Sequence, residues 1–263
     1  MSAGPVSPLV LERYELKYLI PMAMVEPISR YVERFCVLDY FSQISPDLFY
    51  TINSLYFESP SFYFMRAKEN MTARYSLRVR SYGDDPVPPF YIETKEKIAD
   101  FSKKRRGKVP IANWSDVFLN PSKITEFDYT QDPHIMHFLH LTEIHNASPI
   151  ILTQYRRKAY LSTIDDYARV TFDRSLRYRP ETNYDANPNY GMTSYDHPDT
   201  FGHEGANVIL ELKCERKIPM WIVDLIRHFE LVRMGFSKFE GSMVECYRPH
   251  IAESFQFDRI KAY

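Results

Sequence analysis

The sequence predicts an α+β protein: an antiparallel β-sheet with helices on one face and a dense layer of charge on the other. The main evidence is a glutamate–spacer–lysine pattern in three strand-like segments: Glu15-Leu-Lys17, Glu93-Thr-Lys95 and Glu211-Leu-Lys213. Arg78-Val-Arg80 repeats this spacing on a fourth segment. Side chains two residues apart on a strand share a face, so each segment groups its charges on one side and its apolar neighbours on the other. We therefore expect the polar face to bind a highly charged partner.

Strands are predicted where apolar and polar residues alternate. These segments are 10–20, 50–58, 74–82, 90–98, 150–160, 167–174 and 207–216. No internal repeat or domain boundary interrupts the series. We expect one domain over residues 10–248, with terminal tails at 1–9 and 249–263.

The predicted helices lie between these strands and after the last of them. They cover 21–35, a short segment ending at Lys68, 133–145, 219–232 and the chain from 236 onward. Pro21 suits a first helical turn, and Ser61 is the expected cap of the short helix. A basic stretch at 102–110 precedes a helical region broken near Pro121. Residues 180–206 contain several Pro, Asn, Gly and Asp residues and are expected to form a long loop.

Composition narrows the class of protein. With 263 residues, 44% hydrophobic and 15% aromatic, the chain can bury an ample core. Its net charge of −1 creates no overall field that would attract nucleic acid or a membrane. Three scattered cysteines form neither a disulfide framework nor a zinc pattern, which is typical of a reducing compartment. The N-terminus does not look like a signal peptide, and no run of about eighteen apolar residues could span a bilayer. We expect a cytoplasmic protein.

The charged face can have two fates. An open sheet would show its charges to water, whereas a closed sheet would turn them into the lining of a lumen and remove the strand edges. In a lumen, the basic side chains would crowd together with little solvent. They are Lys17, Arg78, Arg80, Lys95 and Lys213. Such crowding is unfavourable unless acidic neighbours and an anionic ligand compensate it, and a chain of phosphates is the ligand that fits.

Several blocks of sequence resemble one family. After Glu15-Leu-Lys17 come LRVRSYG at 77–83, IETK at 92–95, YRRKAY at 155–160, RVTFD at 169–173, LELK at 210–213 and FSKF at 236–239. In this order they resemble the catalytic domain of the vacuolar transporter chaperone (VTC) complex. That domain is a polyphosphate polymerase of the CYTH-like triphosphate tunnel metalloenzyme superfamily. The resemblance runs from about residue 10 to 247. Because no phosphate-sensing domain or membrane helices accompany it, the chain is similar to the stand-alone prokaryotic form.

The resemblance implies a fold and a reaction. The fold is a closed, eight-stranded antiparallel tunnel with a basic lumen and flanking helices. The enzyme transfers the γ-phosphate of ATP to a growing polyphosphate and releases ADP, with Mn²⁺ or Mg²⁺ bound in the tunnel. ATP and polyphosphate are thus the implied partners. Whether a membrane partner protein receives the polymer is left open by the sequence.

The resemblance also implies roles for individual residues. The implied phosphate ligands are Lys17, Arg66, Arg78, Arg80, Lys95, Arg157 and Lys238. Glu211 is the implied metal ligand. Arg169 and Asp173 fall in a matching strand, where Asp173 is expected to orient a lumen arginine.

The chemistry can be reasoned from the residues as well. Phosphoryl transfer depends mostly on positioning and charge neutralisation, which suits arginine forks, lysine point charges and a carboxylate for a hard metal ion. A terminal phosphate oxygen is already ionised, so a polymerase needs no strong base. A tunnel triphosphatase is the first alternative, and it would have to activate water, for which Glu15 and Glu93 are the candidates. The second alternative is a non-catalytic module that binds polyphosphate or nucleotide.

Three further features of the sequence have to be interpreted. Lys213 could simply pair with a neighbouring acid. The basic run Lys103–Arg106 is interpreted as a patch at the tunnel mouth that attracts ATP or guides product, in preference to a nucleic-acid site. The aromatic residues Tyr155, Tyr160 and Phe172 are interpreted as core.

Overall fold

The computed structural model describes residues 13–70, 73–98, 101–195, 208–215 and 217–247. The predicted tails and the last part of the predicted loop, 196–206, lie outside the described residues. No helix in the described ranges is long and apolar enough to cross a bilayer.

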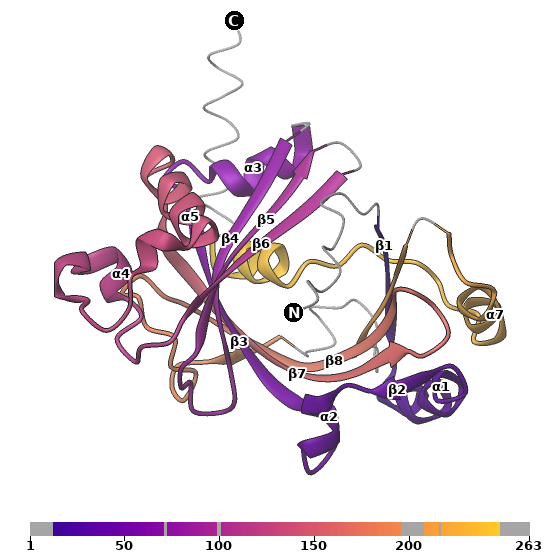
Figure 1. Cartoon of the computed structure of the whole chain (residues 1–263). Coiled ribbons are helices and arrows are strands. Elements are labelled where there is room, and N and C mark those ends of the chain that lie inside the picture. Colours follow the sequence, from indigo (N-terminus) through magenta and orange to yellow (C-terminus); the bar gives the residue numbers. More distant parts are fainter. Residues whose placement is uncertain (1–12, 71–72, 99–100, 196–207, 216, 248–263) are drawn as a thin grey trace, which may run out of the picture.

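One antiparallel sheet organises the molecule. Its main path runs in the order β1 (Arg13–Ile20), β10 (Val208–Glu215), β8 (Ala168–Pro180), β7 (Ser148–Ser162), β3 (Tyr50–Glu58), β4 (Ala73–Tyr82), β5 (Phe90–Ile98) and β6 (Phe101–Val109). Two short strands are added where β2 (Cys36–Leu38) pairs with β7 and β9 (Thr193–Ser194) pairs with β8. The strands curve around a central space, with most helices outside them, whereas the helix at 238–247, drawn in yellow, lies within this curve (Figure 1). This confirms the predicted α+β class.

The predicted closed, eight-stranded tunnel is not confirmed. The sheet has ten strands, and among the described strands no backbone ladder joins β1 to β6. A ladder requires strands only about 4.8 Å apart, whereas long side chains can bridge a wider gap. A side-chain contact does connect this side of the sheet, because Nζ of Lys95 on β5 lies 3.0 Å from a carboxylate oxygen of Glu15 on β1.

Most of the helices lie in the connections between strands, and the last two follow β10. They are η1 (Met22–Met24), α1 (Val25–Val32), α2 (Tyr40–Ile44), α3 (Tyr63–Asn70), α4 (Asp116–Leu119), η2 (Pro121–Lys123), η3 (Tyr129–Gln131), α5 (Pro133–Ile144), α7 (Met220–His228) and the described part of a last helix at 238–247. The helix predicted over 133–145 is confirmed as α5. The one predicted over 21–35 divides into η1 and α1, and the one predicted over 219–232 ends at His228.

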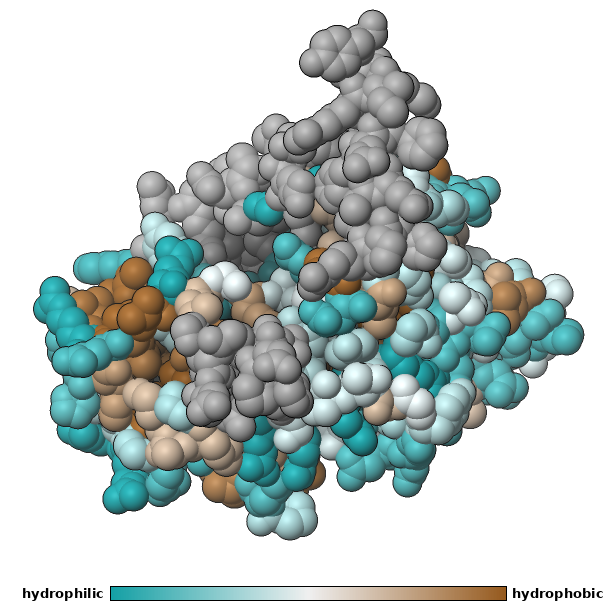
Figure 2. All heavy atoms as spheres, turned by 180° about the vertical axis from the view of Figure 1, so that it is seen from behind, coloured by the Kyte–Doolittle hydropathy of each residue, from teal (hydrophilic) through white to brown (hydrophobic). Residues whose placement is uncertain are grey.

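Two apolar clusters fix the outer face of the sheet to these helices. One joins α1 and α7 to β1, β8 and β10 through residues such as Ile28, Val170 and Leu225. The other joins α5 to β4 and β5, where Phe138 packs in a cluster with Leu77 and Ile92. Since alternate residues face opposite sides of a strand, burying these apolar residues turns the charged ones inward. Seen from behind, the outer surface is largely hydrophilic, with hydrophobic residues gathered on the side where α7 lies (Figure 2).

All of the basic stretch 102–110 except its last residue belongs to a strand, β6, that alternation did not predict. Lysine and arginine occupy both faces of this strand, so the sequence shows no apolar–polar alternation. Gly107 lets α5 approach β6, because a Cβ at this position would collide with the side chain of Ile135. Only the packing of α5 therefore identifies which face of β6 is outside.

Ser61 as the cap of α3 is wrong. The first free N–H groups of this helix are satisfied by other residues: Ser59 Oγ accepts from Tyr63 at 2.9 Å, and the Glu58 carboxylate accepts from Phe64 at 2.8 Å and Met65 at 2.9 Å. The physical reason is a left-handed turn at Phe62 (φ 55°), which separates Ser61 from the cap position.

Candidate phosphate-binding site

A cavity of about 700 Å³ lies on the inner face of the sheet. Every strand of the main path contributes to its wall. Its described lining holds eleven basic side chains: Lys17, Arg74, Arg78, Arg80, Lys95, Lys104, Arg106, Arg157, Arg169, Lys213 and Lys238. Among the described residues, three carboxylates line it with them: Glu15, Glu211 and Glu240. The cavity is therefore a local concentration of positive charge in a chain that is nearly neutral overall.

Glu93 anchors the cations on one side of this cavity. It is almost fully buried, and its carboxylate lies 2.7 Å from both Arg78 and Lys104, 3.0 Å from Arg106 and 3.8 Å from Arg80. Burial opposes its ionisation, but these cations outweigh that effect and hold the pKa of Glu93 well below its usual range. Glu93 thus lies behind the cations and fixes their positions.

Asp173 has the same function on another part of the wall. Its two carboxylate oxygens accept from Nε and Nη2 of Arg157, both at 2.6 Å, and Lys238 Nζ is 2.6 Å away. The bidentate pair holds the guanidinium plane of Arg157 in one orientation. Asp173 thus contacts two cations of the cavity lining, Arg157 and Lys238.

Glu211 lies among four cations. The ammonium of Lys213 is 3.0 Å from its carboxylate, Lys17 is 3.6 Å away, and Lys238 and Arg157 are each 3.7 Å away. Burial raises the pKa of this carboxyl, but the effect of the lysines around it is larger. The net result is a pKa well below the usual value. Glu211 is therefore ionised at neutral pH.

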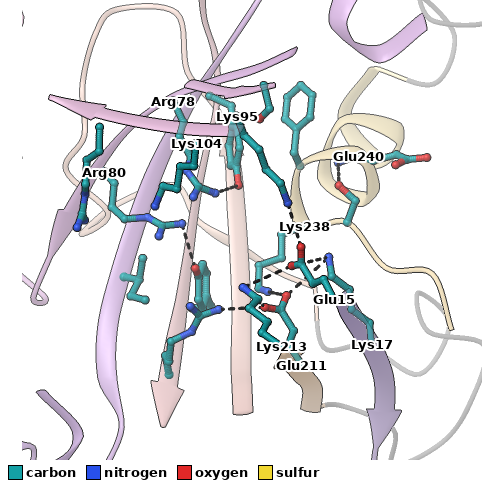
Figure 3. Close-up of a pocket in the computed structure, with 18 of the residues that line it drawn as sticks. Glu15, Lys17, Arg78, Arg80, Lys95, Lys104, Glu211, Lys213, Lys238 and Glu240 are labelled. Atoms are coloured by element: carbon teal, nitrogen blue, oxygen red, sulfur yellow. Dashed lines mark hydrogen bonds and ion pairs between the residues drawn. The ribbon is translucent and has the colours of Figure 1, made fainter. Parts of the chain in front are cut away.

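Glu15 faces Glu211 from the neighbouring strand β1. It contacts Lys95 at 3.0 Å and Lys213 at 3.4 Å, and Figure 3 shows Lys95 extending across the cavity toward it. Burial opposes ionisation here too, but the lysines dominate and lower the pKa of Glu15 to about 2. Lys213 pairs with both acids and also lines the cavity, so the plain pairing reading describes only part of its position.

Most of the residues predicted for the site lie together. Arg169 lines the cavity while Asp39 holds it at 3.0 Å. Arg66, in α3, is not among the described residues that line the cavity.

Sequence reasoning missed other residues of the wall. Lys104 and Arg106 are two apart on β6 and point inward, a signal that was visible only as part of a basic run. Tyr155 also faces the cavity, where its hydroxyl accepts from Arg80 at 3.3 Å, so its assignment to the core was incomplete. Tyr160 and Phe172 are core residues as predicted.

The described residues contain no group of three His, Cys, Asp or Glu side chains that could hold a metal ion alone. Mg²⁺ and Mn²⁺ can instead bind through one or two carboxylates together with phosphate oxygens. Glu211, ionised and facing the cavity beside Glu15, fits such a shared site.

The fold and the cavity define a class of protein. Its members have a curved antiparallel sheet whose inner face is lined with cations, and buried acids contact several of these cations. The VTC domain family matches residues 12–247 of the sequence. The chain therefore belongs to the VTC domain family. No curated protein matches it.

Solved structures with a similar fold are distant in sequence. One is a candidate adenylate cyclase from Bacillus halodurans, with 12% identity and a TM-score of 0.46, covering 87% of this chain and 95% of that one. Another, from Vibrio parahaemolyticus and described in the same way, has 11% identity and a TM-score of 0.44 over 88% and 97%. A candidate adenylyl cyclase from Hippeastrum with a dominant triphosphatase activity has 14% identity and a TM-score of 0.42 over 86% and 92%. The family assignment depends on the sequence match and not on these structures.

Proposed function

We propose that this protein is an ATP-dependent polyphosphate polymerase. A terminal phosphate oxygen of polyphosphate attacks the γ-phosphorus of ATP, the bond from that phosphorus to the β,γ-bridging oxygen breaks, and ADP leaves. The observation that carries the proposal is the set of eleven cations that converge on one cavity, several of which buried acids hold in place. Membership of the VTC domain family supports an enzyme that acts on triphosphate groups.

The cations have complementary tasks in this reaction. The transition state is loose and spreads charge over the phosphoryl oxygens, so stabilisation requires charge that is already positioned. Arg78, Arg80 and Arg157 offer planar forks that suit pairs of phosphate oxygens, and Lys17 and Lys238 act as point charges. Because Glu93 and Asp173 fix these arginines beforehand, little reorganisation is needed during transfer.

The weak basicity of Glu15 and Glu93 favours phosphoryl transfer to phosphate over transfer to water. A triphosphatase must activate water, and an effective general base has a pKa near the working pH. Glu15 has a pKa of about 2, and the pKa of Glu93 also lies well below the usual range. Both are ion-paired with cations and are poor bases, whereas a terminal phosphate oxygen needs no base.

A divalent metal ion would be held by Glu211, with Glu15 as its neighbour, and by phosphate oxygens. When bound, it would neutralise charge on the phosphoryl group that is transferred. The remaining functions belong to the protein: the lysines and arginines bind and orient the phosphates, and the buried acids orient those side chains.

The decisive experiment is incubation of the purified protein with ATP and Mn²⁺. The expected products are ADP and a long polymer that stains as polyphosphate on a gel. ADP with free phosphate as the sole products would exclude the polymerase and leave a triphosphatase.

Glu211→Gln separates an enzyme from a binding module. The change removes one negative charge from among four cations, so binding of inorganic tripolyphosphate should be kept. Turnover should fall by about a hundredfold or more if the carboxylate holds the metal. Glu26→Gln is the matched control, since it removes the same charge from an exposed pair with Arg30 and should leave turnover unchanged. Full activity in Glu211→Gln would contradict the assigned role.

A further inference from the structure

One end of the cavity wall carries a group of aromatic rings that phosphate binding does not require. We call it the aromatic mouth: Phe41 from α2, Tyr50 from β3, Tyr82 from β4 and Tyr91 from β5. Phe41 stacks on Tyr82, with ring centroids 5.7 Å apart and planes 3° apart, and lies 5.5 Å from Tyr50. Tyr82 meets Tyr91 edge to face at 5.8 Å. Four elements thus bring their rings to one place.

The aromatic mouth is accessible to a ligand. Phe41 is 47% exposed, and Tyr50 and Tyr82 are half-buried residues of the cavity lining. By contrast, Tyr56 and Phe239 of the same lining stack on each other at 4.8 Å and are both buried. Packing of a helix on the sheet is enough to explain the buried rings of Tyr56 and Phe239. It does not explain Phe41, because about half of the surface of this side chain stays in water.

Arg106 connects the aromatic mouth directly to the cation cluster. Its Nη2 donates to the Tyr82 hydroxyl at 2.6 Å, and its guanidinium carbon lies 3.7 Å from the centroid of the Tyr91 ring. Its Nε lies 3.0 Å from Glu93, the carboxylate that also holds Lys104. A phosphate bound at these cations is therefore one arginine side chain away from open aromatic rings.

We infer that the aromatic mouth binds the base of a nucleoside triphosphate whose phosphates occupy the cation cluster. The inference deepens the proposed function and rests on it. Every nucleobase has a π face that stacks on aromatic rings, and a neighbouring arginine adds a cation–π contribution. The group of rings beside phosphate-binding cations matches the two chemically different halves of a nucleotide. Inorganic tripolyphosphate would use only the cations.

The inference predicts a change that affects one ligand and spares the other. Affinities for ATP and for inorganic tripolyphosphate are measured by calorimetry without divalent metal, so that no turnover occurs. Phe41→Ala should weaken ATP binding about fivefold or more, the effect of losing one aromatic stack, and leave tripolyphosphate binding unchanged. Ile44→Ala, which shortens another exposed apolar side chain of α2, is the matched control and should change neither affinity.

A second variant keeps a ring at this position and reports on it. In Phe41→Trp, ATP should quench the new indole emission and tripolyphosphate should not, while ATP affinity should equal or exceed that of the wild type. Equal affinities for ATP in wild type and Phe41→Ala, or an equal loss for both ligands, would show that the rings only pack α2 and would overturn the inference. If the wild-type protein binds neither ligand, the proposed function fails together with it. If the protein binds tripolyphosphate but Phe41→Ala does not change its affinity for ATP, the inference about the aromatic mouth fails and the proposed function stands.

Discussion

Buried acids allow many cations to share the cavity. Moving a charge out of water is costly, and crowding like charges adds repulsion. Glu93 and Asp173 offset both costs, because each contacts several cations and is itself almost fully buried. Their hydrogen bonds also restrict the arginine side chains. The same contacts that stabilise the empty cavity therefore set the positions of the groups that face a phosphate.

Lys104 should make ligand binding depend on pH. Burial, with repulsion from Arg78 and Arg80, lowers the pKa of Lys104 to about 7 despite the nearby Glu93 carboxylate. Above that pH the amine is neutral and the cavity has one cation fewer, so affinity for tripolyphosphate should fall by up to roughly tenfold per pH unit. In Lys104→Arg the guanidinium stays charged, and titration calorimetry between about pH 6 and pH 9 should show a shallower fall. Ionisation of the ligand affects both proteins equally, so the comparison cancels it. Identical slopes in the two proteins would contradict this prediction.

Metal binding should require phosphate. Four cations surround the Glu211 carboxylate, so a bare divalent ion would meet strong repulsion there. A bound tripolyphosphate would neutralise these cations and add oxygen ligands. Electron paramagnetic resonance of Mn²⁺ should show little bound metal with the protein alone and clear binding once tripolyphosphate is added. Glu211→Gln should abolish the added binding; tight binding of Mn²⁺ without phosphate would refute the shared site.

At the scale of elements, α3 depends on an acid that precedes it in the sequence. Glu58, at the end of β3, accepts hydrogen bonds from the backbone of Ser59, Phe64 and Met65 at 2.8, 2.8 and 2.9 Å. A carboxylate at this place also complements the positive end of the helix. The contact fixes the first turn of α3 to the sheet.

Glu58→Gln should therefore destabilise the fold. The amide replaces one accepting oxygen with a donor that faces N–H groups, which should lower the free energy of unfolding by about 1–3 kcal/mol. Urea denaturation followed by circular dichroism measures this change. Glu26→Gln, at an exposed ion pair on α1, should stay within about 0.5 kcal/mol of the wild type. An equal, small effect for both variants would mean that Glu58 does not anchor the helix.

At the scale of the whole molecule, the sheet brings together charges from seven of the eight strands of its main path, all except β3. A polyanion that binds them links the strands and favours the folded state. At a hundredfold excess over its dissociation constant, tripolyphosphate should add about 2.7 kcal/mol and raise the melting temperature by roughly 5 °C. Differential scanning fluorimetry tests this shift, which high salt should reduce. Sulfate at equal ionic strength is the control, and an equal shift with sulfate would argue against a site for chained phosphates.

The charged faces of the strands could be predicted because alternation is a local property of the chain. Lys17, Lys95 and Lys213 all face the cavity, as the two-residue spacing in their strands suggested. The strand β6 could not be found in this way, since basic residues occupy both of its faces. Its inward side is determined by α5, which packs on the outer side over Gly107.

The sequence by itself determined the α+β class, the family and the strands on which most of the basic residues lie, because periodicity and motifs are written in neighbouring residues. Only the tertiary structure decided how the sheet ends, with a contact between Lys95 and Glu15 where a closed tunnel was expected. It also decided that Glu93 lies behind the cations, that Arg66 is outside the cavity lining and that aromatic rings gather around Arg106. Each of these depends on distances between residues far apart in the chain, which are set by packing and curvature of the sheet.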